Sequence, residues 1–404
     1  MKKTLLLLTT FFALAACDTE AQIDNRNENY TPIQLTRAQQ ELSTGVNTLA
    51  FNTLDRIVNE NSEEDLLLSP LSLSAALSMV ANGADGDTLS EIIATLGFEG
   101  KSIEDVNAYY RLLIDALVNA DRKVDFISAN SVWVAPDFTI LNSFKKSVEE
   151  NFMAKVDNVD FGSTAGIERI NDWCSENTNG KIPSFFDKPD PSLKVFLANA
   201  LYFNGSWKKA FKNVENKDFH HANGDVSPTK SIVATRNLNY YADEHLQLVE
   251  IPYGNGAYAM DIILPTEGIS LDQTAAHLAQ EGVWESIIHR SNYQEVNLQF
   301  PKFRIENTHN LNNILIELGM PTAFTPMADF SKMANSNLMI SWVKQKTYID
   351  VTEKGTTAAA VTGTGMIESA GPPSEPVSFI ADRPFFFLIR ERSTGIVLFM
   401  GAKC

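Results

Sequence analysis

Residues that could serve as nucleophiles, bases or metal ligands occur in this sequence, but none stands in a recognisable catalytic pattern. Ser206 lies in Gly-Ser-Trp and lacks the Gly-x-Ser-x-Gly turn that exposes a hydrolase nucleophile. Cys174 has no recognisable catalytic partner, so an inert buried thiol is the favoured interpretation. His220 and His221 are adjacent, yet the chain contains no His-Glu-x-x-His and no Cys-x-x-Cys. We therefore expect no enzymatic activity, no metal and no cofactor.

The most unusual pattern lies between residues 356 and 376. Residues 363–376 are rich in Gly, Pro and Ser and are expected to form a long exposed loop, which in a compact domain is more often functional than not. Residues 356–362 before it carry no charge, and every second side chain is small or apolar. Such a stretch can leave a loop and enter a sheet without burying an unpaired charge. The residues by themselves leave this interpretation and a plain linker of small residues equally open.

The secondary structure that must position this segment is predicted to change from helices early in the chain to strands later. Apolar residues at helical spacing predict a helix at about 36–60, Ser69-Pro70 starts another that runs to about 83, and 88–96 forms a third. Apolar and alternating runs predict strands later in the chain, at 124–134, 195–203, 258–264, 295–304, 348–353, 385–390 and 396–401. Early helices and late strands, without a repeat of 30–50 residues, indicate an α+β fold. We expect residues 36–404 to form a single domain.

Composition and charge exclude several classes of protein. The chain has 404 residues, of which 44% are hydrophobic and 21% charged, so it is not disordered throughout. A formal net charge of −17 would repel a polyphosphate, so we expect no nucleic acid partner. Three cysteines cannot form a dense disulfide framework. We expect Cys174 and Cys404 to be free thiols.

The first residues have the features of a bacterial export signal. Lys2 and Lys3 precede an apolar stretch at 5–16, which is too short to span a bilayer because a spanning helix needs about 20 residues. Its end, Leu-Ala-Ala-Cys, resembles a lipobox, with cleavage before Cys17 and lipid attached to that sulfur. A plain cleavage site with an incidental cysteine is the alternative. We expect a signal peptide at 1–16, a lipidated flexible tether at 17–35, and a secreted lipoprotein anchored in the membrane of the cell envelope.

Several separate motifs resemble those of the serpins, the serine protease inhibitors. Residues 353–360 resemble the proximal hinge of that family, and residues 199–207 resemble its central strand and the turn after it. Further matches lie, in the family's order, at 69–72, 171–182, 300–305, 382–387 and 398–401. The resemblance therefore extends from about residue 36 to the C-terminus.

The resemblance implies a fold of three β-sheets with eight or nine helices and an exposed reactive-centre loop at about 354–378. In this family a target peptidase attacks the loop as a substrate, and the hinge then inserts as a new strand into the largest sheet before the acyl-enzyme hydrolyses. The native state is then a kinetic trap, and insertion releases stored strain. On this basis we expect a monomeric suicide-substrate inhibitor that forms covalent complexes with endopeptidases.

The resemblance also places the hinge and the contacts at the top of the large sheet. Lys302 is expected to face Glu353, with Trp207 packed nearby, although the ion pair could equally be a solvated surface contact. The hinge itself falls on Glu353, Lys354, Gly355, Thr356, Thr357, Ala358, Ala359 and Ala360.

A second set of family positions forms the polar cluster under the centre of the large sheet, which controls its opening. Gln345 stands where the family usually has His, and because Gln both donates and accepts, the hydrogen-bond network can persist. The other members of the cluster are Ser69, Ser72 and Asn199.

By the resemblance, Ser369 is the scissile residue, because it is the seventeenth residue when Glu353 is counted as the first, so the predicted bond lies between Ser369 and Ala370. Bonds after Met366, Ile367 or Glu368 are alternatives, because the length of this loop varies. From residue 355 to 382 there is no Lys or Arg, so a trypsin-like pocket finds no cation to bind. The small residues at the predicted bond suit elastase-like serine peptidases, whereas Met366 or Ile367 would suit chymotrypsin-, subtilisin- or papain-like sites.

Two other functions compete with inhibition. A serpin-fold binding module could keep the architecture without the trap, but its usual mark is bulky or charged hinge residues, which 356–360 do not have. A surface-anchored interaction protein could use the acidic character of the chain. Only the inhibitor predicts that cleavage of the loop stabilises the protein.

Overall fold

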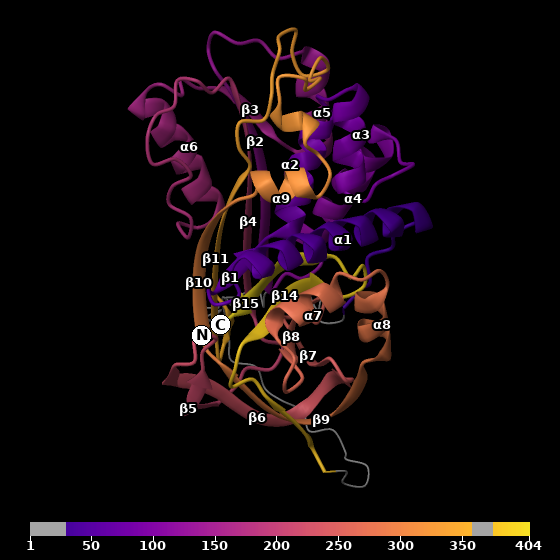
Figure 1. Cartoon of the computed structure of the whole chain (residues 1–404), viewed down its shortest axis with the longest axis vertical. Coiled ribbons are helices and arrows are strands. Elements are labelled where there is room, and N and C mark those ends of the chain that lie inside the picture. The colour runs from indigo at the N-terminus through magenta and orange to yellow at the C-terminus, as the bar shows by residue number, and fades with distance from the viewer. Residues whose placement is uncertain (1–29, 358–374) are drawn as a thin grey trace, which may run out of the picture.

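The computed structural model describes residues 30–357 and 375–404 (Figure 1). Over these residues it confirms the α+β fold class. Nine α-helices lie in the described part of the chain: α1 (Arg37–Glu60), α2 (Pro70–Ala81), α3 (Gly86–Thr95), α4 (Ile103–Asn119), α5 (Asn142–Phe152), α6 (Thr164–Asn177), α7 (Leu271–Leu278), α8 (Val283–Arg290) and α9 (Asn312–Glu317). A short 3-10 helix, η2 (Thr322–Phe324), follows α9.

The first two helices begin where their capping residues require. The hydroxyl of Thr36 accepts from the backbone N–H of Gln39, and the side chain of Gln39 accepts from the backbone N–H of Thr36, so a capping box starts α1. Pro70 is the first residue of α2, a position that needs no donor. Ser69, directly before it, makes no capping hydrogen bond, which leaves its hydroxyl available for another contact.

A six-stranded sheet runs along the long axis of the molecule (Figure 1). Its hydrogen-bonded order is β10 (Phe303–Asn310), β11 (Lys344–Thr352), β12 (Gly355–Thr356), β4 (Val195–Ser206), β2 (Val124–Val134) and β3 (Lys155–Asn158). Neighbours are antiparallel except β2 and β3, which are parallel. Within the described residues, β11 and β4 are therefore joined only through the two residues of β12.

A nine-stranded sheet contains the remaining strands. Its order is β1 (Leu66–Leu68), β15 (Val397–Lys403), β14 (Phe385–Glu391), β8 (Tyr258–Pro265), β7 (Leu246–Pro252), β6 (Val226–Ala242), β9 (Asn292–Pro301) and β13 (Val377–Ile380), and β5 (Asn213–His220) also pairs with β6. β6 is 17 residues long and pairs with β5 and β9 along most of its length and with β7 at its end. The resemblance implies three sheets, and two of them are joined here into one hydrogen-bonded sheet by this long strand.

The prediction of one strand at 295–304 was wrong. The chain ends β9 at Pro301 and starts β10 at Phe303, and the two strands belong to different sheets. Between them, the backbone N–H of Lys302 donates to the carbonyl of Lys230 at 2.7 Å. The apolar alternation changes phase here, from Val296, Leu298 and Phe300 to Phe303 and Ile305, so the sequence carries a sign of the break that the prediction overlooked.

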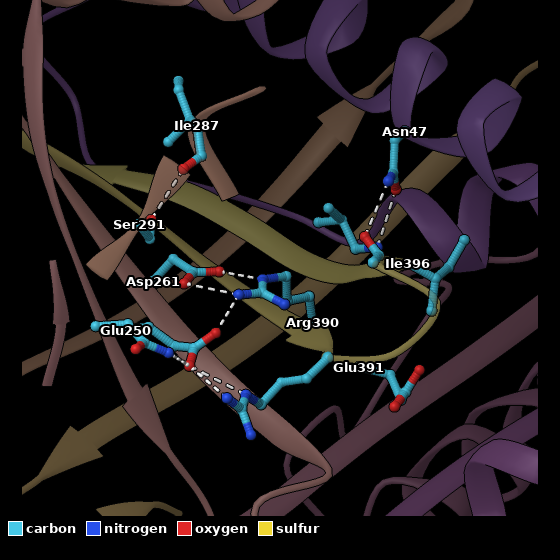
Figure 2. A network of polar contacts seen from close by, with 12 residues as sticks. Asn47, Glu250, Asp261, Ile287, Ser291, Arg390, Glu391 and Ile396 are labelled. Atoms are coloured by element: carbon cyan, nitrogen blue, oxygen red, sulfur yellow. Dashed lines mark hydrogen bonds and ion pairs between the residues drawn. The ribbon is translucent and has the colours of Figure 1, made fainter. Parts of the chain in front are cut away.

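The nine-stranded sheet contains a buried network of charges (Figure 2). Nε of Arg390 on β14 lies 2.6 Å from a carboxylate oxygen of Asp261 on β8, and the same guanidinium is paired with Glu250 on β7. Arg392 adds a second cation, with Nη2 2.9 Å from Glu250. Buried charges are retained only when they are paired and hydrogen-bonded, and this network satisfies that condition on three adjacent strands.

Candidate functional site

The hinge predicted from the sequence begins as a strand inside the six-stranded sheet. After β11 the chain turns at Glu353 and Lys354 and returns as β12 between β11 and β4. Thr356 pairs with Val351 of β11 on one side and with Gly205 of β4 on the other. Gly355 and Thr356 therefore already separate β11 from β4, the two strands between which the rest of the uncharged stretch could follow.

Only glycine fits at position 355. Gly355 has a φ of +148°, which L-residues with side chains rarely adopt. A Cβ atom at this residue would lie 2.1 Å from the carbonyl oxygen of Gly205 and 2.7 Å from Cα of Ser206. The close approach of β12 to β4 thus depends on the missing side chain.

Thr356 is held by a buried aromatic pair. Its side chain is 1% exposed, and its hydroxyl lies 2.5 Å from the hydroxyl of Tyr253. The ring of Tyr253 stacks on Trp207 with centroids 4.4 Å apart and an interplanar angle of 16°. Burial raises the pKa of Tyr253 well above its ordinary value, so the phenol stays neutral and can share its proton with Thr356.

The turn that precedes β12 is closed by an ion pair. Nζ of Lys302 lies 2.7 Å from Oε2 of Glu353, and the hydrogen bond from Lys302 is the main reason that the pKa of Glu353 is lowered. The two side chains are 32% and 27% exposed, so the pair contributes no more than about 1 kcal/mol. It orients the turn more than it stabilises the fold.

Trp207 fixes the same turn through its backbone and its ring. Its backbone N–H donates to the carbonyl of Lys354 at 3.0 Å, and its indole Nε1–H donates to the carbonyl of Thr352 at 2.8 Å. Phe211 follows by donating its backbone N–H to the carbonyl of Glu353 at 2.9 Å. The segment after β4 therefore holds both ends of the hinge turn.

The predicted polar cluster is only partly connected by hydrogen bonds. Ser69 donates its backbone N–H to Oε1 of Gln345, and Nε2 of Gln345 donates to the carbonyl of Ser69, both at 2.8 Å. The Ser69 hydroxyl donates to the carbonyl of Leu398 at 2.9 Å. Asn199, on β4, bonds instead to Asn130 of β2 at 2.6 Å. Ser72 is buried and lines the same cavity as Asn199 and Gln345.

Three residues near these positions were missed by sequence reasoning. Tyr253 binds the hinge threonine, Asn130 binds Asn199, and His309 lies opposite Gln345 in the register of β10 and β11. Burial lowers the pKa of His309, so its imidazole stays neutral beside the cluster. The sequence around Tyr253 and Asn130 does not predict their roles, because each binds a partner that lies far away in the sequence and is brought close only by the fold.

Several predicted residues lie outside the described part of the chain. They are Cys17, Ala358, Ala359, Ala360, Met366, Ile367, Glu368, Ser369 and Ala370. Cys174 and Cys404 are described, and both are buried free thiols whose pKa values burial raises to about 11 and about 12. Such thiols are poor nucleophiles at neutral pH.

The described residues contain neither a membrane-spanning helix nor a metal-binding cluster. No helix among them has the length and apolar character needed to cross a membrane. No group of three or more His, Cys, Asp or Glu side chains within the same residues could hold a metal ion.

The hinge strand β12 and the six-stranded sheet that it enters define a class of protein in which the segment after β11 turns back into the main sheet. The chain belongs to the serpin family, whose model, described as serine protease inhibitor, matches residues 44–404. Intracellular coagulation inhibitor 2 of Tachypleus tridentatus is 35% identical over 379 residues, covering 91% of each chain.

Solved structures agree with this assignment. The native state of the thermophilic serpin tengpin is 31% identical, with a TM-score of 0.81 over 93% of this chain and 96% of that one. Human thyroxine-binding globulin, complexed with thyroxine, is 25% identical, with a TM-score of 0.81 over 90% of this chain and 98% of that one. The fold of eight or nine helices implied by the resemblance is thereby confirmed.

Proposed function

We propose that this protein is a suicide-substrate inhibitor of endopeptidases. The observation that carries the proposal is the position of β12, with Thr356 buried between β11 and β4. Membership of a family whose model is described as serine protease inhibitor, and the similarity to a coagulation inhibitor, support the same function.

In the proposed mechanism the nucleophile of the peptidase attacks the carbonyl carbon of Ser369. The Ser369–Ala370 bond breaks, the new amine of Ala370 takes the proton, and an acyl-enzyme ester remains on Ser369. Residues after Thr356 then continue as a strand between β11 and β4, whose facing edges below β12 have no strand partner among the described residues. Each backbone hydrogen bond formed there contributes about 1 kcal/mol, so insertion is favourable. Insertion outruns hydrolysis of the ester because residues 356–362 are uncharged and their entry buries no unpaired charge.

The proposed targets are elastase-like serine peptidases, because Ser369 and Ala370 are small, and trypsin-like peptidases are excluded because residues 355–382 contain no Lys or Arg. Incubation with elastase should give a covalent complex that survives SDS, and incubation with trypsin should give none. Mass spectrometry of the fragment released by elastase should show cleavage after Ser369. A trypsin complex formed through this loop would contradict the proposed specificity. Cleavage after Met366, Ile367 or Glu368 would show that the scissile bond is one of the alternatives and not Ser369–Ala370.

A non-inhibitory binding protein is the second candidate, because the similar thyroxine-binding globulin is named for the ligand it binds. The two candidates differ in what loop cleavage does to heat stability. In an inhibitor, insertion of about ten further residues should raise the melting temperature by about 20 °C, given about 1 kcal/mol for each new hydrogen bond. The test is calorimetry of the protein before and after limited proteolysis within 363–376, with the cut confirmed by mass. An unchanged melting temperature would favour the binding protein.

We also propose that the protein is exported and anchored to the cell envelope through lipid on Cys17. The support is the sequence alone, in which a basic and apolar leader ends in Leu-Ala-Ala-Cys. An inhibitor tethered in this way would protect the envelope from peptidases that reach it from outside.

A further inference from the structure

A serine, a histidine and a backbone oxygen meet beside the hairpin that joins β5 to β6, both labelled in Figure 1. Nε2 of His221 lies 2.8 Å from Oγ of Ser227, and Nδ1 of the same ring lies 3.0 Å from the backbone oxygen of Cys404. The hairpin turn brings the first two residues together, because the backbone N–H of Gly224 donates to the carbonyl of His221 and reverses the chain between them.

The tautomer of His221 follows from its two partners. A backbone oxygen can only accept a hydrogen bond, so Nδ1 carries the proton that is donated to Cys404. In the neutral imidazole Nε2 then has a free lone pair, and the hydroxyl of Ser227 donates to it. The proton of the Ser227 hydroxyl is therefore already directed at a base.

The oxygen that orients the histidine is itself held in place. Nζ of Lys403 donates to the backbone oxygen of Cys404 at 3.2 Å and lies 3.0 Å from both carboxylate oxygens of Asp65. Asp65 in turn accepts from the backbone N–H of Cys404 at 2.9 Å. A T-shaped contact with Phe219, with ring centroids 5.0 Å apart, supports the imidazole from β5. The base is thus oriented by groups from two different parts of the chain.

This serine and histidine are accessible to solvent. Both side chains are partly exposed, and the turn residues 222–226 between them are exposed. Buried polar groups need protein partners because water cannot reach them, which explains pairs such as Ser74 with Tyr110. An accessible hydroxyl can bond to water instead, so burial does not account for the pairing of Ser227 with His221.

We propose that Ser227 is a nucleophile that accepts an acyl group from a small activated ester, with His221 as its general base. A nucleophile bonded to a base that a third group orients is the arrangement that activates serine for this chemistry. Oγ of Ser227 bonds to the acyl carbon while its proton passes to Nε2 of His221. The bond from the acyl carbon to the leaving group breaks, and the leaving group departs with the electron pair. His221 then releases the proton to water.

The donor must be an activated ester because its leaving group departs as a stable anion and needs no proton from the protein. The product is an acyl ester of Ser227, which is a covalent modification. Since a serine alkoxide is a poorer leaving group than such an anion, hydrolysis of the product is slower than its formation. The site contains no residue of the hinge or of the scissile bond, so this proposal does not depend on the inhibitory function.

The reactivity of Ser227 is tested by incubating the full protein with p-nitrophenyl acetate and locating the acetyl group by peptide mass spectrometry. Ser378, an exposed serine of β13, is the reference within the same molecule. We expect Ser227 to be acetylated at least tenfold faster than Ser378, since a positioned general base accelerates proton transfer by at least that factor. Equal rates at the two serines, or no acetylation of Ser227, would overturn the proposal.

The role of His221 is tested with two matched variants. His221→Gln keeps a donor for the oxygen of Cys404 but removes the basic nitrogen, whereas His220→Gln makes the same change at the adjacent, exposed histidine. We expect acetylation of Ser227 to slow at least tenfold in the first variant and to keep its rate in the second. An unchanged rate in His221→Gln, or an equal loss in both variants, would refute the assignment of His221 as the base. If His221→Gln does not fold, the comparison of Ser227 with Ser378 in the unmodified protein still decides whether this serine is activated.

Discussion

Replacing Thr356 by arginine should convert the protein from an inhibitor into a substrate of elastase-like peptidases. Thr356 is buried between β11 and β4 and shares a hydrogen bond with Tyr253. An arginine there loses this bond and places a guanidinium, which cannot shed its proton, in a space that holds a small hydroxyl. Burial of an unpaired charge costs several kcal/mol even after the protein relaxes.

Thr356 is already inserted before cleavage, so the variant should avoid this cost by leaving β12 out of the sheet, and the cost then falls on insertion, the step that competes with hydrolysis. Each 1.4 kcal/mol added to the insertion barrier slows insertion about tenfold relative to deacylation. We therefore expect the number of Thr356→Arg molecules consumed for each elastase inhibited to rise at least tenfold. Titration of a fixed amount of elastase measures this number, and SDS gels should show cleaved protein in place of the covalent complex.

Thr357→Arg is the matched control for this substitution. Thr357 is the next residue, only partly buried, and its φ of +58° is already unfavourable for a β-branched side chain, so arginine adds no further strain there. Its backbone N–H still donates to Asp350 in the variant. We expect Thr357→Arg to inhibit nearly as well as the unmodified protein. A Thr356→Arg protein that titrates elastase one to one would show that burial of this position does not control insertion.

The sequence predicted the residue types of the hinge better than it predicted what holds the hinge. The small and uncharged side chains of the hinge can be recognised directly in the sequence. So can Gly355, which the close approach to Gly205 requires. Tyr253 could not be predicted in the same way. It comes from a turn about a hundred residues earlier, and two long-range pairings, of Tyr253 with Trp207 and of β4 with β12, bring it to Thr356.

The same contrast holds for the fold, in which elements with a local sequence signal could be predicted and features set by distant partners could not. The strand at 124–134 was predicted with both of its bounds, since its apolar residues and its pairing partner extend over the same length. α4 was overlooked, although Ser102 and Asp105 form a capping box at its start. The break at Lys302 was also overlooked, although the apolar alternation changes phase there, whereas the sheet that each half joins depends on distant partners.

Replacing Arg390 by methionine should destabilise the protein by about 3–5 kcal/mol, the usual cost of leaving buried charges without their partner. Glu250 and Asp261 are directly opposite each other in the register of β7 and β8, and both are buried. Like charges at opposed positions repel, and the Arg390 guanidinium offsets this repulsion by pairing with both carboxylates (Figure 2). Burial by itself lowers the pKa of Arg390, but the two carboxylates more than offset this effect and raise it.

Arg392→Met makes the same change at the edge of the network and serves as the control. Its side chain is 29% exposed and touches only Glu250 among the carboxylates, so its loss should cost about 1 kcal/mol or less. Urea unfolding of both variants, followed by tryptophan fluorescence, measures the difference. Equal losses for the two variants would mean that the buried position of Arg390 adds nothing.

A double variant separates the effect of charge from the effect of lost packing. Adding Asp261→Asn to Arg390→Met removes one of the two stranded carboxylates but restores none of the volume of the arginine. If unpaired charge is the cause, the double variant should recover at least half of the lost stability, because one neutral amide and one carboxylate no longer repel across β7 and β8. If packing is the cause, the double variant should be no more stable than Arg390→Met. Recovery would show that the network stabilises the protein by pairing its buried charges and not by filling volume.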